Sequence, residues 1–303
     1  MRPWMRFAIK LLLLAAVVGV LTLRFPDRVD AVLDGMRLVS GGQIAAIVAI
    51  GLLSQVLYAV RWRALLDEPA ADVPPLSTFI RYTLVSQMIG LAAPGGAQIL
   101  VQGLMTRSEG SGGAEPWLAL GAERLISLAT NPVVAGVALL LLPSSMRWLG
   151  LGVLAAGALA IGLLLVAHRG VAWAGRALPE RIVDLAGAVG PRIRRPGVVV
   201  PAALGHVALG VLFVIIFVPG SEMLAGDVMG VALLTAWAGL LPSLFGLGPA
   251  QAAQVVLLVR IGGDPSIVAA QALVIWGLSV VAAVAAGAVA WLVGPRPSAE
   301  EPS

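Results

Sequence analysis

The sequence predicts an all-α, polytopic integral membrane protein built of inverted repeats, each with a broken re-entrant helical hairpin. Hydrophobic residues make up 59% of the 303 residues and charged residues only 12%, whereas globular domains are about 25% charged. Apolar runs recur that are long enough to cross roughly 30 Å of hydrocarbon as helices. Two of the apolar stretches are interrupted by similar segments that contain glycine and proline. We therefore expect one transmembrane domain over residues 1–303.

Six apolar runs are predicted to form membrane-spanning helices. They cover residues 7–23, 44–60, 117–142, 148–167, 198–218 and 267–293. The first run could be mistaken for a secretory signal, but no small-x-small cleavage site follows Leu23. We interpret it as a retained first helix.

The two interrupted segments resemble each other. Residues 91–98 read LAAPGGAQ and residues 244–251 read LFGLGPAQ, with a second glutamine, Gln102 or Gln254, shortly after each. Backbone that cannot remain helical is tolerated in a membrane only where it is buried in protein or lines a wet cavity. Paired breaks at corresponding positions of two halves favour a binding site near the bilayer midplane.

The basic residues predict the topology, because cytoplasmic loops are enriched in lysine and arginine. With the N-terminus in the cytoplasm, 14 of the 20 basic residues lie inside and 5 outside, while Arg124 lies within a span. This assignment requires hairpins at residues 79–105 and 231–259 that return to the side they entered, the first opening to the cytoplasm and the second to the outside. Repeat one (44–142) and repeat two (198–293) then point in opposite directions across the cell membrane, with both termini cytoplasmic.

Three connecting segments are too polar to span. Residues 24–42 are expected to form an outer loop, and the tail 294–303 is expected to be disordered. Residues 168–196 carry several arginines, and apolar residues recur at helical spacing after Pro179. This pattern is typical of an amphipathic helix on the anionic cytoplasmic leaflet. A linker that only sets the topology is the alternative.

Few polar residues fall inside the predicted spans. Glu123 is the only carboxylate among them, and Arg124 is its neighbour in sequence. Adjacent helical side chains point about 100° apart, so each is expected to need a different partner. Charges at this depth are usually functional or paired, although Arg124 could instead extend to the surface.

Other intramembrane polar residues are weaker candidates. Pro132, which follows Asn131, is expected to kink its helix. His206 is more typical of a hydrogen-bonded core residue than of a proton carrier. The remaining glutamines are expected to join helices rather than bind substrate; they are Gln55, Gln87 and Gln271.

Several classes of function are disfavoured. The absence of cysteine excludes disulfides, thiolate nucleophiles and cysteine metal sites. No G-x-x-x-x-G-K-[ST] fingerprint is present, so ATP hydrolysis by this chain is not expected. The basic residues follow the ends of apolar runs, which indicates topology rather than nucleic-acid binding. No catalytic constellation, cofactor site or metal site is expected.

Four segments resemble a known family in their order and spacing. They are YAVRWRALL (58–66), the LAAPGGAQ break, GAERL (121–125) and LPSLFGLGPAQ (241–251). Together they are similar to the flippase-like domain that forms the membrane part of bacterial lysylphosphatidylglycerol synthases and also occurs as stand-alone proteins. The resemblance covers roughly residues 44–293, and we do not expect an aminoacyl-transferring domain in this chain. The family commonly has an acidic residue after the glycines of both breaks, where this chain has Gln98 and Gln251. This difference argues against a transport mechanism that is coupled to charge through these two positions.

The resemblance implies a protein that binds a lipid or lipid-linked head group and moves it between leaflets. The ligand would be a phospholipid or a polyprenyl-linked lipid, with a phosphate or sugar bound at the breaks. The expected binding residues are Gly95, Gly96, Gln98, Gln102, Glu123, Arg124, Gly246, Gly248, Gln251 and Gln254. A non-transporting regulatory subunit is one alternative. A membrane-embedded lipid-modifying transferase, with Glu123 or His206 as the base, is the other.

Overall fold

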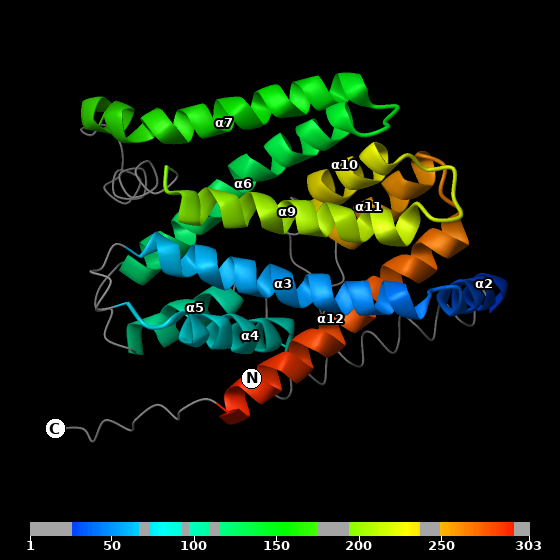
Figure 1. The fold of residues 1–303 in the computed structure, drawn as a ribbon, viewed down its shortest axis with the longest axis horizontal. Helices are drawn as coiled ribbons and strands as arrows, with labels where there is room; N and C mark the ends of the chain where they lie inside the picture. Colours follow the sequence, from blue (N-terminus) through cyan, green and yellow to red (C-terminus); the bar gives the residue numbers. More distant parts are fainter. Residues whose placement is uncertain are drawn as a thin grey trace.

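The computed structural model describes residues 26–66, 73–92, 97–108, 115–174, 194–236 and 249–293. Over these residues it contains ten helices and no strand (Figure 1). The helices are α2 (Pro26–Arg37), α3 (Gly41–Leu65), α4 (Leu76–Ala92), α5 (Ala97–Ser108), α6 (Glu115–Leu141), α7 (Arg147–Ala174), α9 (Pro196–Phe217), α10 (Ala225–Thr235), α11 (Pro249–Arg260) and α12 (Pro265–Val293). The predicted all-α class is confirmed.

Five of these helices are long and apolar enough to cross a membrane. They are α3, α6, α7, α9 and α12, and their bounds lie within a few residues of five of the predicted runs, except that α7 continues seven residues further, to Ala174. The sixth predicted run, residues 7–23, lies outside the described residues. So do residues 175–193 of the basic linker and the tail after Val293.

The two interrupted segments are flanked by short helices. The first break separates α4 from α5, and the second separates α10 from α11. The members of each pair pack against each other, and the two pairs lie toward opposite ends of the molecule (Figure 1). The inverted relation of the halves and the re-entrant path remain predictions.

The outer segment 24–42 differs from the expected loop, because most of it forms α2. Pro26 occupies the first position of this helix, where its missing N–H costs nothing. Helix α2 packs against α12, and Gly35 allows the approach: a Cβ on Gly35 would lie 2.7 Å from the Cβ of Ala270.

Side chains just outside two spanning helices fix where those helices begin. Ser40 accepts a hydrogen bond from the backbone N–H of Gln43, and the Gln43 side chain accepts one from Ser40, so α3 begins with a capping box. At the start of α12, the Asp264 carboxylate accepts hydrogen bonds from Ser266 and the backbone N–H of Ile267. The hydroxyl of Ser266 is the main cause that holds the pKa of Asp264 below its usual value.

A buried carboxylate joins α10 to the loop between α6 and α7. Asp227, in the first turn of α10, is 2% exposed and accepts hydrogen bonds from Ser144, Ser145 and the backbone N–H of Met146. Burial alone raises the pKa of Asp227, but these hydrogen bonds outweigh burial and hold the pKa below its usual value. No pattern in the sequence predicts this contact.

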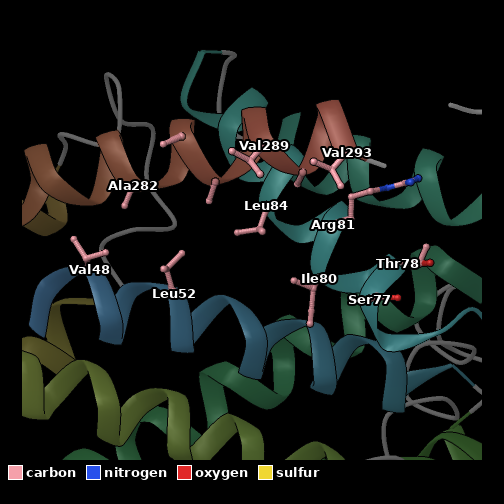
Figure 2. A pocket seen from close by; sticks show the side chains of 13 residues that line it. Val48, Leu52, Ser77, Thr78, Ile80, Arg81, Leu84, Ala282, Val289 and Val293 are labelled. Atoms are coloured by element: carbon pink, nitrogen blue, oxygen red, sulfur yellow. The ribbon is translucent and has the colours of Figure 1, made fainter. Parts of the chain in front are cut away.

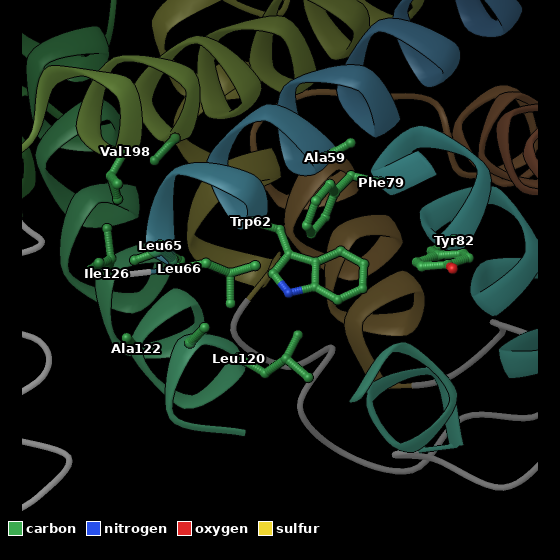
Figure 3. Packing of buried hydrophobic residues seen from close by; sticks show 12 residues of the cluster. Ala59, Trp62, Leu65, Leu66, Phe79, Tyr82, Leu120, Ala122, Ile126 and Val198 are labelled. Atoms are coloured by element: carbon green, nitrogen blue, oxygen red, sulfur yellow. The ribbon is translucent and has the colours of Figure 1, made fainter. Parts of the chain in front are cut away.

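One hydrophobic core lies where α3, α4, α6 and α9 meet. Trp62 and Phe79 are completely buried there, with ring centroids 5.1 Å apart in an edge-to-face arrangement. Figure 3 shows these rings beside Leu120 of α6, with Val198 of α9 in the same cluster. This core holds α3 and α6 together next to the polar groups described below.

Candidate functional site

A buried ion pair joins α3 to α6. Arg61 donates a hydrogen bond from Nη2 to Oε1 of Glu123, and the two side chains are 9% and 1% exposed. Ser127, one turn further along α6, donates to the same carboxylate oxygen at 3.1 Å. A buried charge is tolerated when it is paired and hydrogen-bonded in this way.

The Arg61 side chain is also held from within its own helix. Its guanidinium carbon lies 5.3 Å from the centre of the Tyr58 ring, a distance at which a cation is attracted to an aromatic face. The Tyr58 hydroxyl in turn donates to Oε1 of Gln102 on α5 at 3.2 Å. Arg61 is therefore fixed in position by contacts on α3 and α6.

Arg124 occupies a different environment from Glu123. Its Nε lies 3.5 Å from Oε2 of Glu123, and its side chain is 41% exposed whereas that of Glu123 is 1% exposed. The expectation that each residue needs a different partner holds for Glu123, which is hydrogen-bonded to Arg61, but Arg124 also contacts the Glu123 carboxylate. The group contains two guanidinium ions and one carboxylate, which leaves one positive charge in excess.

Both arginines line a cavity of about 330 Å³ between α3, α4, α5, α6 and α9, which we call the arginine cavity. Its lining residues are Ser54, Gln55, Leu57, Tyr58, Arg61, Gln87, Gln98, Arg124, Pro201, Ala202, Gly205, His206 and Leu209. Glu123 is not among them, so the described wall presents two guanidinium groups and no carboxylate.

A second cavity of about 240 Å³, which we call the glutamine cavity, adjoins the first. Its lining residues are Gln87, Leu209, Phe213, Gln251, Gln254, Ala272, Ile275, Trp276, Ser279 and Val280. Gln87 and Leu209 line both cavities. Gln98, after the first break, and Gln251 and Gln254, after the second, therefore lie in neighbouring cavities that share a wall.

Three residues that line the arginine cavity each carry a buried polar atom without a hydrogen-bond partner among the described residues. The atoms are Nε of Arg61, Oε1 of Gln87 and Nε2 of His206. A buried polar group without a partner costs roughly 1–3 kcal/mol. A polar ligand or water that reached these atoms from the cavity would supply the missing partners.

The predicted site residues divide into three groups. Gln98 and Arg124 line the arginine cavity, and Gln251 and Gln254 line the glutamine cavity. Gln102 and Glu123 are buried, do not line either cavity, and contact Tyr58 and Arg61. The remaining predicted residues lie outside the described part of the chain; they are Gly95, Gly96, Gly246 and Gly248.

Sequence reasoning missed three residues of the cavity walls. Arg61 was interpreted as a topology-setting cation, Gln87 as a contact between helices and His206 as a core residue. A signal for Arg61 does exist, because Ser54, Tyr58 and Arg61 recur at positions i, i+4 and i+7 of a mostly apolar helix. Such a polar stripe indicates that one face of α3 is turned away from lipid.

Asn131 has a structural contact. Its side-chain amide donates to the backbone carbonyl of Leu233 at 2.8 Å, in the last turn of α10. Pro132 lies inside α6, which is helical from Glu115 to Leu141. Asn131 therefore connects α6 to α10, the short helix before the second break.

Comparison with known proteins gives one family. A family model described as the lysylphosphatidylglycerol synthase TM region matches residues 6–287. No curated protein and no solved structure matches the chain. The matched region contains both cavities, both breaks and the buried ion pair.

Proposed function

This chain belongs to the lysylphosphatidylglycerol synthase transmembrane-region family, and we propose that it binds the anionic head group of a membrane lipid and moves it between leaflets. The family supports a lipid-related role in a multi-pass membrane protein. The head group would bind in the arginine cavity and pass along the wall that this cavity shares with the glutamine cavity.

The charge of the arginine cavity is the observation that carries the proposal. Two guanidinium groups line it, and the carboxylate that they contact lies outside its wall. Planar guanidinium groups bind phosphate oxygens through paired hydrogen bonds. A phosphate entering this cavity would meet an excess of positive charge in surroundings of low dielectric constant, where such attraction is strong.

The two arginines would have different roles. Arg61 is buried and held by Glu123 and Tyr58, so it provides a fixed binding group. Arg124 is 41% exposed, with only a long contact to Glu123. It is therefore the arginine that can reorient to contact an arriving phosphate.

The glutamines would line the path with neutral hydrogen-bonding groups. Each amide offers two donors and one carbonyl acceptor, so Gln98, Gln87 and Gln251 could bind phosphate or sugar oxygens without holding a permanent charge. Carboxylates at these positions would repel an anion. The amides of this chain therefore suit an anionic head group that has to leave the arginines and move on.

A vesicle assay tests this proposal. The purified protein is reconstituted in phosphatidylcholine vesicles that contain either fluorescent phosphatidylglycerol or fluorescent phosphatidylcholine, and a membrane-impermeant quencher reports how fast each lipid changes leaflets. We expect faster exchange of phosphatidylglycerol, and loss of this difference in Arg124→Gln. The matched control is Arg147→Gln, at the exposed start of α7.

Other outcomes would favour the alternatives. If neither lipid changes leaflets faster in vesicles that contain the protein than in protein-free vesicles, the transport proposal is contradicted. Covalent conversion of the labelled lipid would support a transferase, with His206 as the base that lines the cavity. Co-purification with a protein at fixed stoichiometry, without lipid exchange, would support a regulatory subunit.

A further inference from the structure

Two side chains of the arginine cavity carry buried atoms that a phosphate alone would not satisfy. Oε1 of Gln87, on α4, and Nε2 of His206, on α9, have no hydrogen-bond partner among the described residues. The Gln87 amide oxygen accepts hydrogen bonds and cannot donate one. Because the oxygens of a phosphodiester also only accept, they cannot pair with it. The ligand of this cavity therefore needs a hydrogen-bond donor besides its phosphate.

The unpartnered atoms lie at the central site and not at the larger groove on the outside of the helix bundle. That groove, of about 680 Å³, lies between α3, α4 and α12 and is lined mainly by aliphatic side chains, among them Val48, Leu52 and Val289 (Figure 2). None of its described lining residues carries a buried polar atom without a hydrogen-bond partner. Of these two cavities, the arginine cavity is the one whose described wall a polar ligand would complete.

The hydrogen bond of the His206 ring assigns the role of its free nitrogen. The ring is hydrogen-bonded to the backbone of Ser127 on α6, and Nε2 has no partner, so the bond is made by Nδ1. The backbone N–H of Ser127 lies in the interior of α6 and is used by the helix itself, so the Ser127 carbonyl accepts this bond. Nδ1 then carries the proton of the neutral ring, and Nε2 is an acceptor.

A hydroxyl group is the donor that fits two such acceptors. An ammonium group could also donate, but Arg61 and Arg124 line the same cavity, and no carboxylate is present among its described lining residues. A further positive charge would be repelled by both guanidinium groups, and this repulsion is strong where the dielectric constant is low. An uncharged hydroxyl donates without such repulsion.

We propose that Gln87 and His206 select a polyol head group, which is a head group with two or more hydroxyls. The guanidinium groups of Arg61 and Arg124 bind the lipid phosphate, and hydroxyls next to that phosphate donate to Oε1 of Gln87 and Nε2 of His206. This inference rests on the proposed function, whose site it shares, and it adds the chemical class of the head group. Choline fits poorly because it has no donor, and an amine fits poorly because of its charge.

Lipid competition tests the proposal with two probes that differ only in their hydroxyls. Phosphatidylglycerol and phosphatidylpropanol have the same charge and a head group of three carbons, but phosphatidylpropanol lacks both free hydroxyls. The purified protein in detergent is incubated with equal amounts of both lipids, with matched acyl chains, and the bound lipids are measured by mass spectrometry after free lipid is removed. We expect phosphatidylglycerol to be enriched at least about five-fold, which is the factor that one hydrogen bond typically gives.

Variants of the two acceptors should remove this enrichment and keep the preference for an anion. Gln87→Leu and His206→Phe should each lower the enrichment several-fold, while phosphatidylpropanol is still preferred over phosphatidylcholine. His206→Gln offers an acceptor again and should restore part of the enrichment. Gln271→Leu, in neither central cavity, and Ala286→Phe, which fills the apolar groove, are controls that should keep it. If His206→Phe does not fold, Gln87→Leu still decides the question.

Three results would overturn the proposal. They are equal binding of phosphatidylglycerol and phosphatidylpropanol by the wild-type protein, an enrichment that is unchanged in both Gln87→Leu and His206→Phe, and binding of phosphatidylethanolamine as tight as that of phosphatidylglycerol. Failure of the proposed function gives a different result. Equal binding of phosphatidylpropanol and phosphatidylcholine would show that the cavity does not prefer an anion, and it would remove the site on which this inference rests.

Discussion

Arg61 and Glu123 are 62 residues apart in the sequence and form a buried ion pair between α3 and α6. The pair places one guanidinium in the wall of the arginine cavity and keeps its counter-ion behind that wall. The Arg61 side chain therefore has two roles: it joins α3 to α6 through Glu123, and it lines the arginine cavity. Substitutions of Arg61 and Glu123 can separate the structural role from the binding role.

Removing one partner of the pair should destabilise the protein. Glu123→Gln leaves Arg61 buried without a counter-ion, which typically costs about 3–5 kcal/mol. The double variant Arg61→Met with Glu123→Leu replaces both charges by apolar groups and should recover most of the lost stability. It should still bind less anionic lipid, because one guanidinium is missing. Thermal unfolding in detergent and lipid content by mass spectrometry measure the two effects; a double variant with normal lipid binding would remove Arg61 from the site.

Arg124→Lys should fold normally and lose most lipid binding or exchange. Lysine keeps the charge but not the planar fork that holds a phosphate through two hydrogen bonds. Stability and exchange should be measured on the same sample, with Arg147→Lys as the control. Wild-type exchange would mean that Arg124 only anchors α6 at the membrane surface, and loss of folding would make it a structural partner of Glu123.

The glutamines of the cavity walls should be required for exchange but not for folding. Leucine at Gln98, Gln251 or Gln87 removes hydrogen-bonding groups from the path while keeping similar volume. Glutamate should be tolerated poorly, since a carboxylate at depth is costly and repels an anion. Gln271→Leu is a matched control, because Gln271 lines neither central cavity. Normal exchange by the leucine variants in vesicles would refute the assigned path.

Cysteine labelling should report the topology, because the chain has no cysteine of its own. Single cysteines at Ser108, the last residue of α5, and at Ser298 should react only from the cytoplasmic side, and one at Ser221 only from outside. The expectation follows from the uneven distribution of basic residues. Labelling of Ser108 and Ser298 from opposite sides would contradict the inverted-repeat arrangement.

Asp227 should make stability depend on pH. Its pKa is lower in the folded protein than the usual value of 3.8, because hydrogen bonds from Ser144, Ser145 and Met146 outweigh burial. A depressed folded pKa stabilises the protein above the unfolded pKa, and this contribution is lost as the pH falls through the folded pKa. Thermal unfolding at a series of acidic pH values should show this loss in the wild type and not in Asp227→Asn. Asp227→Asn should also be less stable at neutral pH; equal stability of the two proteins there would argue that the contact is weak.

Much of the fold could be predicted because a bilayer imposes simple requirements on a chain. Five of the six predicted spans lie in described residues, and their helices agree with the apolar runs because crossing the hydrocarbon takes about 20 apolar residues. The interrupted segment 91–98 is also flanked by α4 and α5, and the segment 244–251 by α10 and α11, as their proline and glycine residues favour. The helix α2 was missed because its polar composition carries no membrane signal, and it is stabilised by packing on α12.

Only some of the residues of the candidate site could be predicted from the sequence. The repeated breaks indicated Gln98 and Gln251 by their position, and Arg124 stood out as a charge within a span. The contacts inside the site depend on the rotation and crossing of α3, α4, α5 and α6. Through them Arg61 pairs with Glu123, Gln87 lines both cavities, and Gln102 is hydrogen-bonded to Tyr58. The sequence by itself determined which segments are helical and apolar, because these properties follow from composition and local periodicity. Only the tertiary structure decided which polar side chains share a cavity, because that depends on contacts between residues far apart in the chain.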